Sequence, residues 1–127
     1  MKKEGQTNFN VIICTEDNSV DYDILKDKCN KILSRKLSDP EVNIKLLTRE
    51  RSPLVEKYSK DIGLPLQIIQ ADWKVQGKLA GVKRNNRLVE LGNACILFSN
   101  SSNSKSGLDD LRKKAEKSRL LVREIKL

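Results

Sequence analysis

The polar residues whose types and spacing suit chemistry are concentrated between residues 71 and 107. A guanidinium at Arg84 can hold a phosphate through a charge-assisted fork, and the adjacent carboxamide of Asn85 can pair with a base or a ribose edge. One turn earlier, Gly77 and Gly81 leave one side of the chain nearly bare, so a ligand or another backbone can approach closely. The spacing fits nucleotide binding and close packing of a helix on a sheet equally well.

Two residues at the start of this segment each have two interpretations. Trp73 offers a platform on which a base can stack, but a single tryptophan beside a strand is more often part of a core or an interface. Asp72 can hold a ribose hydroxyl or act as a base, and it is equally suited to cap the helix expected from Val75.

A loop rich in hydroxyls and amides, residues 99–106, ends the segment. Ser104, Lys105, Ser106 and the amide of Gly107 stand just before an expected helix, where free backbone amides favour phosphate. An unoccupied flexible loop has the same composition, so both interpretations stay open.

Strand and helix patterns alternate along the whole chain and must position these residues. Short apolar runs predict strands, and apolar residues at helical spacing between turn signals predict helices. The expected strands are Phe9–Cys14, Val42–Leu47, Leu64–Gln70, Ala94–Phe98 and Leu120–Ile125, and the expected helices lie around Leu25–Leu33 and over Pro53–Ile62, Val75–Leu91 and Gly107–Ser118. Such alternation predicts an α/β, Rossmann-like three-layer sandwich with a mainly parallel sheet and helices on both faces. We expect one domain over residues 1–127.

Composition excludes several kinds of site. The chain has no histidine, and none of its three cysteines lies in a Cys-x-x-Cys pair, so we expect no metal site, no cofactor and no catalytic triad. Cys14, Cys29 and Cys95 are expected to be buried thiols. No apolar run is long enough to cross a membrane and no signal peptide begins the chain, which predicts a cytoplasmic protein without a membrane partner.

The net charge of +8 is concentrated in the second half. Residues 1–70 hold 12 basic and 11 acidic side chains, whereas residues 71–127 hold 13 basic and 6 acidic ones. This asymmetry favours an anionic partner, either a phosphorylated small molecule or nucleic acid, although lysines on solvated helix faces produce it too. Six basic residues near the end suit a nucleic-acid backbone or a solvated face: Arg112, Lys113, Lys114, Lys117, Arg119 and Arg123.

The order of residues adds a resemblance. The motifs ADW, GK-x-AG and RNNRLVE, followed by an apolar strand and a Ser-rich loop, resemble the YspA-type, YpsA-related family of the SLOG superfamily. The resemblance implies a Rossmann-like fold, a nucleotide or nucleotide-derived ligand and possible homo-oligomers. The residues that match the family's binding motif are Asp72, Trp73, Gly77, Gly81, Arg84 and Asn85, with Ser104, Ser106 and Gly107 approximating its last loop.

The chain departs from the family pattern in its first two loops. Where the family has a glycine and an arginine, residues 14–17 read Cys-Thr-Glu-Asp, and Glu16 would repel a phosphate. The second loop, residues 46–52, holds no glycine and places Glu50 and Ser52 at the family's positions, so Arg49 or Arg51 would have to replace the backbone cradle.

The leading prediction is therefore ligand binding as a sensor or sequestering protein, with no catalytic residue. The alternatives are a basic nucleic-acid-binding module and a phosphoribohydrolase-like enzyme, although the latter's PGG-x-GT loop is missing.

Overall fold

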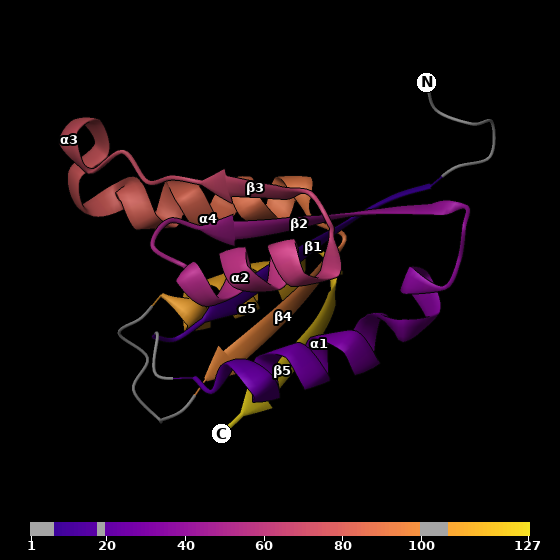
Figure 1. Ribbon diagram of the computed structural model, residues 1–127. Coiled ribbons are helices and arrows are strands. Elements are labelled where there is room, and N and C mark those ends of the chain that lie inside the picture. The colour runs from indigo at the N-terminus through magenta and orange to yellow at the C-terminus, as the bar shows by residue number, and fades with distance from the viewer. Residues whose placement is uncertain (1–6, 18–19, 100–106) are drawn as a thin grey trace.

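A single parallel sheet forms the centre of the computed structural model, which describes residues 7–17, 20–99 and 107–127. In these residues the sheet has five strands in the order β3-β2-β1-β4-β5 (Figure 1). The strands are β1 (Thr7–Thr15), β2 (Val42–Arg49), β3 (Leu66–Ile69), β4 (Ala94–Ser99) and β5 (Leu121–Lys126). All four strand pairings are parallel, as the alternation of strands and helices predicted.

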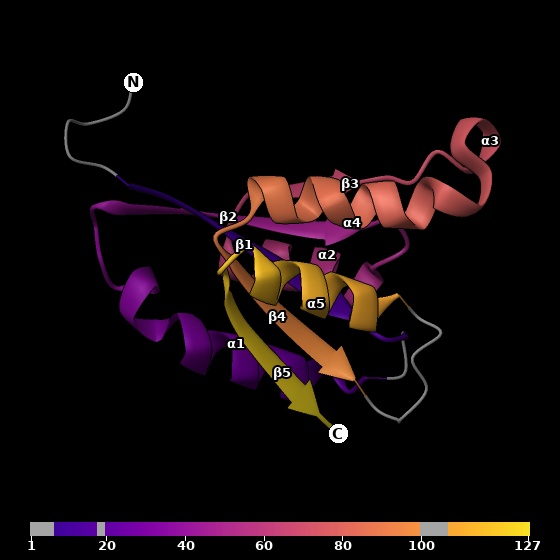
Figure 2. The same cartoon turned by 180° about the vertical axis from the view of Figure 1, so that it is seen from behind.

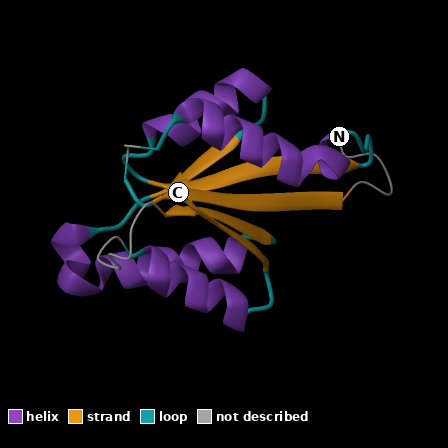
Figure 3. Ribbon diagram, turned by 90° about the horizontal axis from the view of Figure 1, so that it is seen from below, coloured by secondary structure: helices purple, strands orange, loops and turns teal. Residues whose placement is uncertain are grey.

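Helices cover both faces of this sheet (Figures 2 and 3). One face packs on α1 (Tyr22–Leu37) and α2 (Pro53–Ile62), and the other on α4 (Ala80–Leu91) and α5 (Leu108–Lys117). Aliphatic side chains supply most of both apolar layers. Alternate residues of β1 and β4 point to opposite faces of the sheet, so each of these strands contributes to both layers. The predicted Rossmann-like three-layer fold is confirmed.

Local signals place the two helices of the first face. Of the apolar residues that stand at helical spacing in α1, Leu25, Cys29 and Leu33 are buried, whereas Ile32 is exposed. Helix α2 begins at the predicted proline and ends at Ile62. The next residue, Gly63, caps it with a φ of 72°, the left-handed conformation that glycine tolerates.

The sequence prediction of one continuous helix over Val75–Leu91 is wrong. The segment forms the short helix α3 (Trp73–Gln76), the 3₁₀ turn η1 (Gly77–Leu79) and then α4. The break lies at Gly77, whose φ of 56° and ψ of −131° no helix contains. A Cβ added to Gly77 would meet nothing within 4 Å. Glycine therefore suits the backbone conformation of the break and is not needed for a close approach of other atoms.

The three cysteines are free and buried, as the sequence predicted. Burial raises the pKa of the Cys29 thiol to about 12, and it also raises the pKa of Cys14 and of Cys95. All three therefore stay protonated at neutral pH and act as small apolar side chains.

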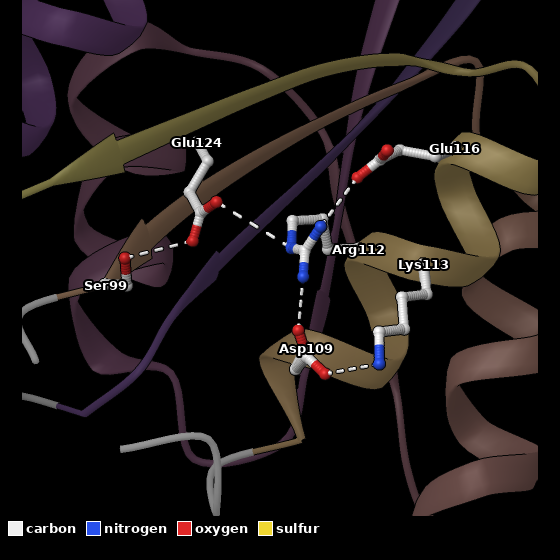
Figure 4. Close-up of polar contacts among 6 residues, drawn as sticks. All are labelled: Ser99, Asp109, Arg112, Lys113, Glu116 and Glu124. Carbon is white, nitrogen blue, oxygen red and sulfur yellow. Dashed lines mark hydrogen bonds and ion pairs between the residues drawn. The ribbon is translucent and has the colours of Figure 1, made fainter. Parts of the chain in front are cut away.

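Ion pairs attach α5 to the edge of the sheet, with Arg112 at their centre (Figure 4). Its guanidinium pairs with Asp109 and Glu116 on the same helix and lies 3.8 Å from Glu124 on β5. Glu124 in turn accepts a hydrogen bond of 3.2 Å from the hydroxyl of Ser99, the last residue of β4. The network joins the helix to both strands that end near it.

Gly92, directly after α4, is the tightest glycine of the described chain. A Cβ there would lie 2.7 Å from Cδ1 and 2.9 Å from Cγ1 of Ile12, and 3.2 Å from the carbonyl oxygen of Leu88. Because Ile12 is fully buried, Gly92→Ala is expected to lower the free energy of unfolding by about 2 kcal/mol, measured by urea denaturation. Adding Ile12→Val removes the closest atom and should recover part of this loss. If the double variant loses the full sum of the two single effects, the overlap with Ile12 is not the cause.

Candidate functional site

A cleft of about 770 Å³ opens at the carboxyl ends of β1 and β2. Because the chain crosses to the other side of β1 when it passes from β3 to β4, the switch in strand order lies beside this cleft. Open α/β sheets bind ligands at such a switch point. The amide of Glu16 donates to the Phe98 carbonyl at 2.8 Å, which keeps β1 and β4 together up to the edge of the cleft.

Asn85 on α4 lines the cleft and is only 2% exposed. Its Nδ2 donates to the Asp110 carboxylate at 3.0 Å and to the Gly107 carbonyl at 3.3 Å. These two acceptors fix the amide orientation, so Oδ1 is left as an acceptor with no hydrogen-bond partner among the described residues. A buried acceptor without a partner costs free energy, and a ligand donor would relieve that cost.

Arg84, the neighbouring predicted residue, is already paired. Its Nη1 forms an ion pair with Glu50, and the other carboxylate oxygen of Glu50 accepts the Ala71 amide at 3.0 Å. The Arg84 side chain is 9% exposed, and its Nε has no hydrogen-bond partner in the described part of the chain. The guanidinium that the sequence assigned to phosphate therefore neutralises a carboxylate at the end of β2.

Arg49, at the end of β2, takes a different place in the cleft. Its Nη2 donates to the carbonyl oxygen of Thr15 at 2.6 Å, which ties the ends of β2 and β1 together. A Cβ on Gly107 would lie 3.6 Å from Nη1 of Arg49, so the guanidinium also reaches the start of α5. Gly107 has a φ of 81°, which explains glycine at this position.

The remaining predicted residues divide into three groups. Trp73 and Gly81 line the cleft together, and a Cβ on Gly81 would lie 3.4 Å from Cη2 of the indole. Asp72 is exposed and caps α3, accepting the Val75 amide at 3.1 Å, which confirms the capping interpretation. Asp72 and Gly77 are not among the residues that line the cleft. Ser104, Lys105 and Ser106 lie outside the described residues.

Charges of both signs line the cleft. The carboxylates are Glu16, Asp17, Glu50 and Asp110, and the cations are Arg49, Arg51, Lys78 and Arg84. Burial raises the pKa of Asp110, but hydrogen bonds from Asn85 and Lys114 outweigh it and hold that pKa below its usual value. Because Asp109 and Asp110 occupy the first turn of α5, this helix N-terminus attracts anions less than the sequence suggested.

The roles of two cleft residues were not predicted from the sequence. Asp110 orients Asn85, and Glu50 pairs with Arg84, although the partners lie 25 and 34 residues apart along the chain. The opposite charges of Glu50 and Arg84 were the only signal for their pairing, and a charge pattern cannot select one partner at that separation. Arg51, which the sequence offered as a substitute for a glycine, has a φ of 60°.

Comparison with protein families, curated proteins and solved structures gives no match to this chain. Among the described residues, no group of three or more His, Cys, Asp or Glu side chains could hold a metal ion. The same part of the chain contains no helix that is both long and apolar enough to cross a bilayer.

Proposed function

We propose that the protein binds a nucleotide or nucleotide-derived ligand in the cleft and acts as a sensor or a sequestering protein. The observation that carries this proposal is the buried Asn85, whose donors are engaged while its Oδ1 has no partner in the described residues. The acceptor lies at the switch point of a parallel sheet, where an imino, amino or hydroxyl group of a nucleoside is a suitable donor.

The charges of the cleft narrow the ligand class. Glu50 neutralises Arg84, and the other cations that line the cleft are Arg49, Arg51 and Lys78. Four carboxylates, Glu16, Asp17, Glu50 and Asp110, line the same cleft and equal its four cations in number. We therefore favour a ligand with few charges, such as a single phosphate group, over a triphosphate.

Nucleic-acid binding and nucleotide hydrolysis rank behind this proposal. Arg112, Lys113 and Lys114, three of the basic residues near the end of the chain, form ion pairs with Asp109, Glu116 and Asp110. These pairs reduce the positive charge that a phosphate backbone would meet. Hydrolysis needs a general acid or a nucleophile beside a phosphate loop, and the PGG-x-GT loop of hydrolysing relatives is missing from this sequence.

A thermal-shift screen against nucleotides, cyclic dinucleotides, ADP-ribose derivatives and short oligonucleotides tests the proposal. A ligand at a hundred times its Kd stabilises the folded chain by about 2.7 kcal/mol, and Asn85→Ala should weaken that ligand at least about tenfold. Asn86→Ala, an exposed amide on the same helix, is the matched control and should bind as the parent does. A nucleotide that binds both variants equally contradicts the assignment of Asn85. A response to oligonucleotides alone, lost with salt, would favour the nucleic-acid alternative.

A further inference from the structure

A short projecting segment, residues 73–83, extends beyond the carboxyl end of β3 (Figures 1 and 2). We call it the arm; it consists of α3, η1 and the first residues of α4. Neither α3 nor η1 contributes a buried residue. Ala80, the first residue of α4, is the one buried residue of residues 73–83, so the arm adds little to the core that holds the fold together.

Large apolar side chains of the arm are nevertheless exposed. The exposed fractions are 56% for Trp73, 80% for Val75, 58% for Leu79 and 41% for Val82. Scattered exposed aliphatic residues need no explanation, but four within eleven consecutive positions form a local concentration. Exposed apolar side chains at this density are typical of a surface that contacts a partner.

The charges between these apolar residues have one sign. Lys74, Lys78 and Lys83 are exposed, and residues 73–83 contain no aspartate or glutamate. The partner of the arm must therefore combine negative charge with an apolar interior. An anionic bilayer has both, because acidic headgroups cover hydrocarbon.

We propose that the arm docks on the surface of a membrane that contains anionic phospholipids. Trp73, Val75, Leu79 and Val82 enter the boundary between headgroups and acyl chains, and the three lysines bind the headgroups. Tryptophan favours this boundary, and basic residues beside apolar ones are typical of surface-bound segments. The sequence expectation of no membrane partner rested on the lack of a crossing segment, and a surface contact needs none.

Other occupants fit the arm less well. A second copy of the arm would bring lysines against lysines, which opposes self-association. A nucleic acid would satisfy the lysines and could stack on Trp73, but the aliphatic Val75, Leu79 and Val82 gain nothing from bases and phosphates. Charge complementarity together with the aliphatic side chains favours the bilayer.

The emission of Trp73 provides a direct test, because it is the only tryptophan of the chain. Purified protein is mixed with phosphatidylcholine vesicles, with and without phosphatidylserine, in the absence of nucleotide. The proposal expects a blue shift of the emission with phosphatidylserine vesicles alone, and quenching by lipids brominated near the headgroup. Sedimentation of the vesicles measures partitioning in the same samples.

Two pairs of charge reversals separate docking by the arm from general attraction. Lys74→Glu with Lys78→Glu should lower partitioning at least about tenfold. Lys26→Glu with Lys28→Glu changes two exposed lysines of α1, on the opposite face of the sheet, and should have a small effect. Equal losses in the two pairs would overturn docking by the arm. All four positions are exposed, so the variants should fold.

Val75→Ser with Leu79→Ser keeps the charge and tests the apolar contribution. This variant should partition less and show a smaller blue shift, whereas unchanged emission would overturn insertion. If the parent protein shows no blue shift with phosphatidylserine vesicles, the proposal is also overturned. This holds whether or not an oligonucleotide quenches the emission of Trp73. Trp73, Lys78 and Val82 also line the cleft. Because the vesicle experiments contain no nucleotide, their outcomes test membrane docking and not ligand binding.

Discussion

Replacing Glu50 by glutamine is expected to lower the free energy of unfolding by about 2 kcal/mol, because it leaves the guanidinium of Arg84 without its counter-charge. The Arg84 side chain is 9% exposed and that of Glu50 is 22% exposed, so water compensates only part of the loss. In a chain of this size the change corresponds to about 8 °C in Tm. Urea and thermal denaturation measure it directly.

The same substitution should strengthen the binding of anions. Glutamine no longer neutralises Arg84, so a phosphate that enters the cleft finds one more cation at the end of β2. We expect at least about a fivefold gain in affinity for inorganic phosphate or a nucleotide at low salt, measured by calorimetry. Loss of stability without any gain in affinity would mean that the guanidinium of Arg84 is not accessible to ligand.

Glu56→Gln provides the matched control, since it makes the same chemical change at an exposed position of α2. It should alter stability by less than about 0.5 kcal/mol. Arg84→Met combined with Glu50→Gln closes a double-mutant cycle, and the double variant should lose less stability than the sum of the single ones. Additive losses would show that the two side chains do not depend on each other.

The fold was predictable because its signals are local. The apolar run of β4 and the Pro53 and Gly63 boundaries of α2 each lie within a few residues, and an alternating order of such elements allows few topologies. The one wrong element shows the limit of local pattern. Val75, Leu79 and Val82 repeat at helical spacing, but the helix is interrupted at Gly77 and all three side chains are exposed.

The candidate site was only partly predictable, because its contacts join residues far apart in the sequence. Local motifs located Arg84 and Asn85, and the resemblance suggested their ligand class, which the structure leaves as a proposal. Neither indicated that Glu50 would bind the guanidinium or that Asp110 would bind the amide. Both contacts depend on how α4 lies between the end of β2 and the start of α5. That arrangement follows from packing of the whole sheet, not from any single segment.

Asn85→Asp should be among the most damaging single substitutions at the cleft. The new carboxylate would face the Asp110 carboxylate, 3.0 Å from Nδ2 of the present amide, and the Gly107 carbonyl at 3.3 Å. Because residue 85 is 2% exposed, two acceptors would meet with little water between them. We expect a loss of about 3 kcal/mol or more at pH 7. The exposed Asn86→Asp on the same helix should cost less than about 0.5 kcal/mol.

Lowering the pH should reduce this loss of stability. A loss that shrinks at low pH would show that the charge of the new carboxylate causes it. Repulsion from Asp110 and burial raise the pKa of the new carboxyl in the folded chain above its unfolded value of about 3.9. The loss in free energy of unfolding relative to the parent protein is therefore smallest below the unfolded-state pKa. It grows as the pH rises through that pKa and levels off above the pKa of the folded chain. Denaturation of both proteins at matched pH values gives this difference.

Adding Asp110→Asn restores one donor opposite one acceptor and should recover much of the stability at pH 7. A loss that is independent of pH and is not recovered by Asp110→Asn would mean that the two side chains do not meet, and that Asp110 does not orient the acceptor of Asn85 toward a ligand.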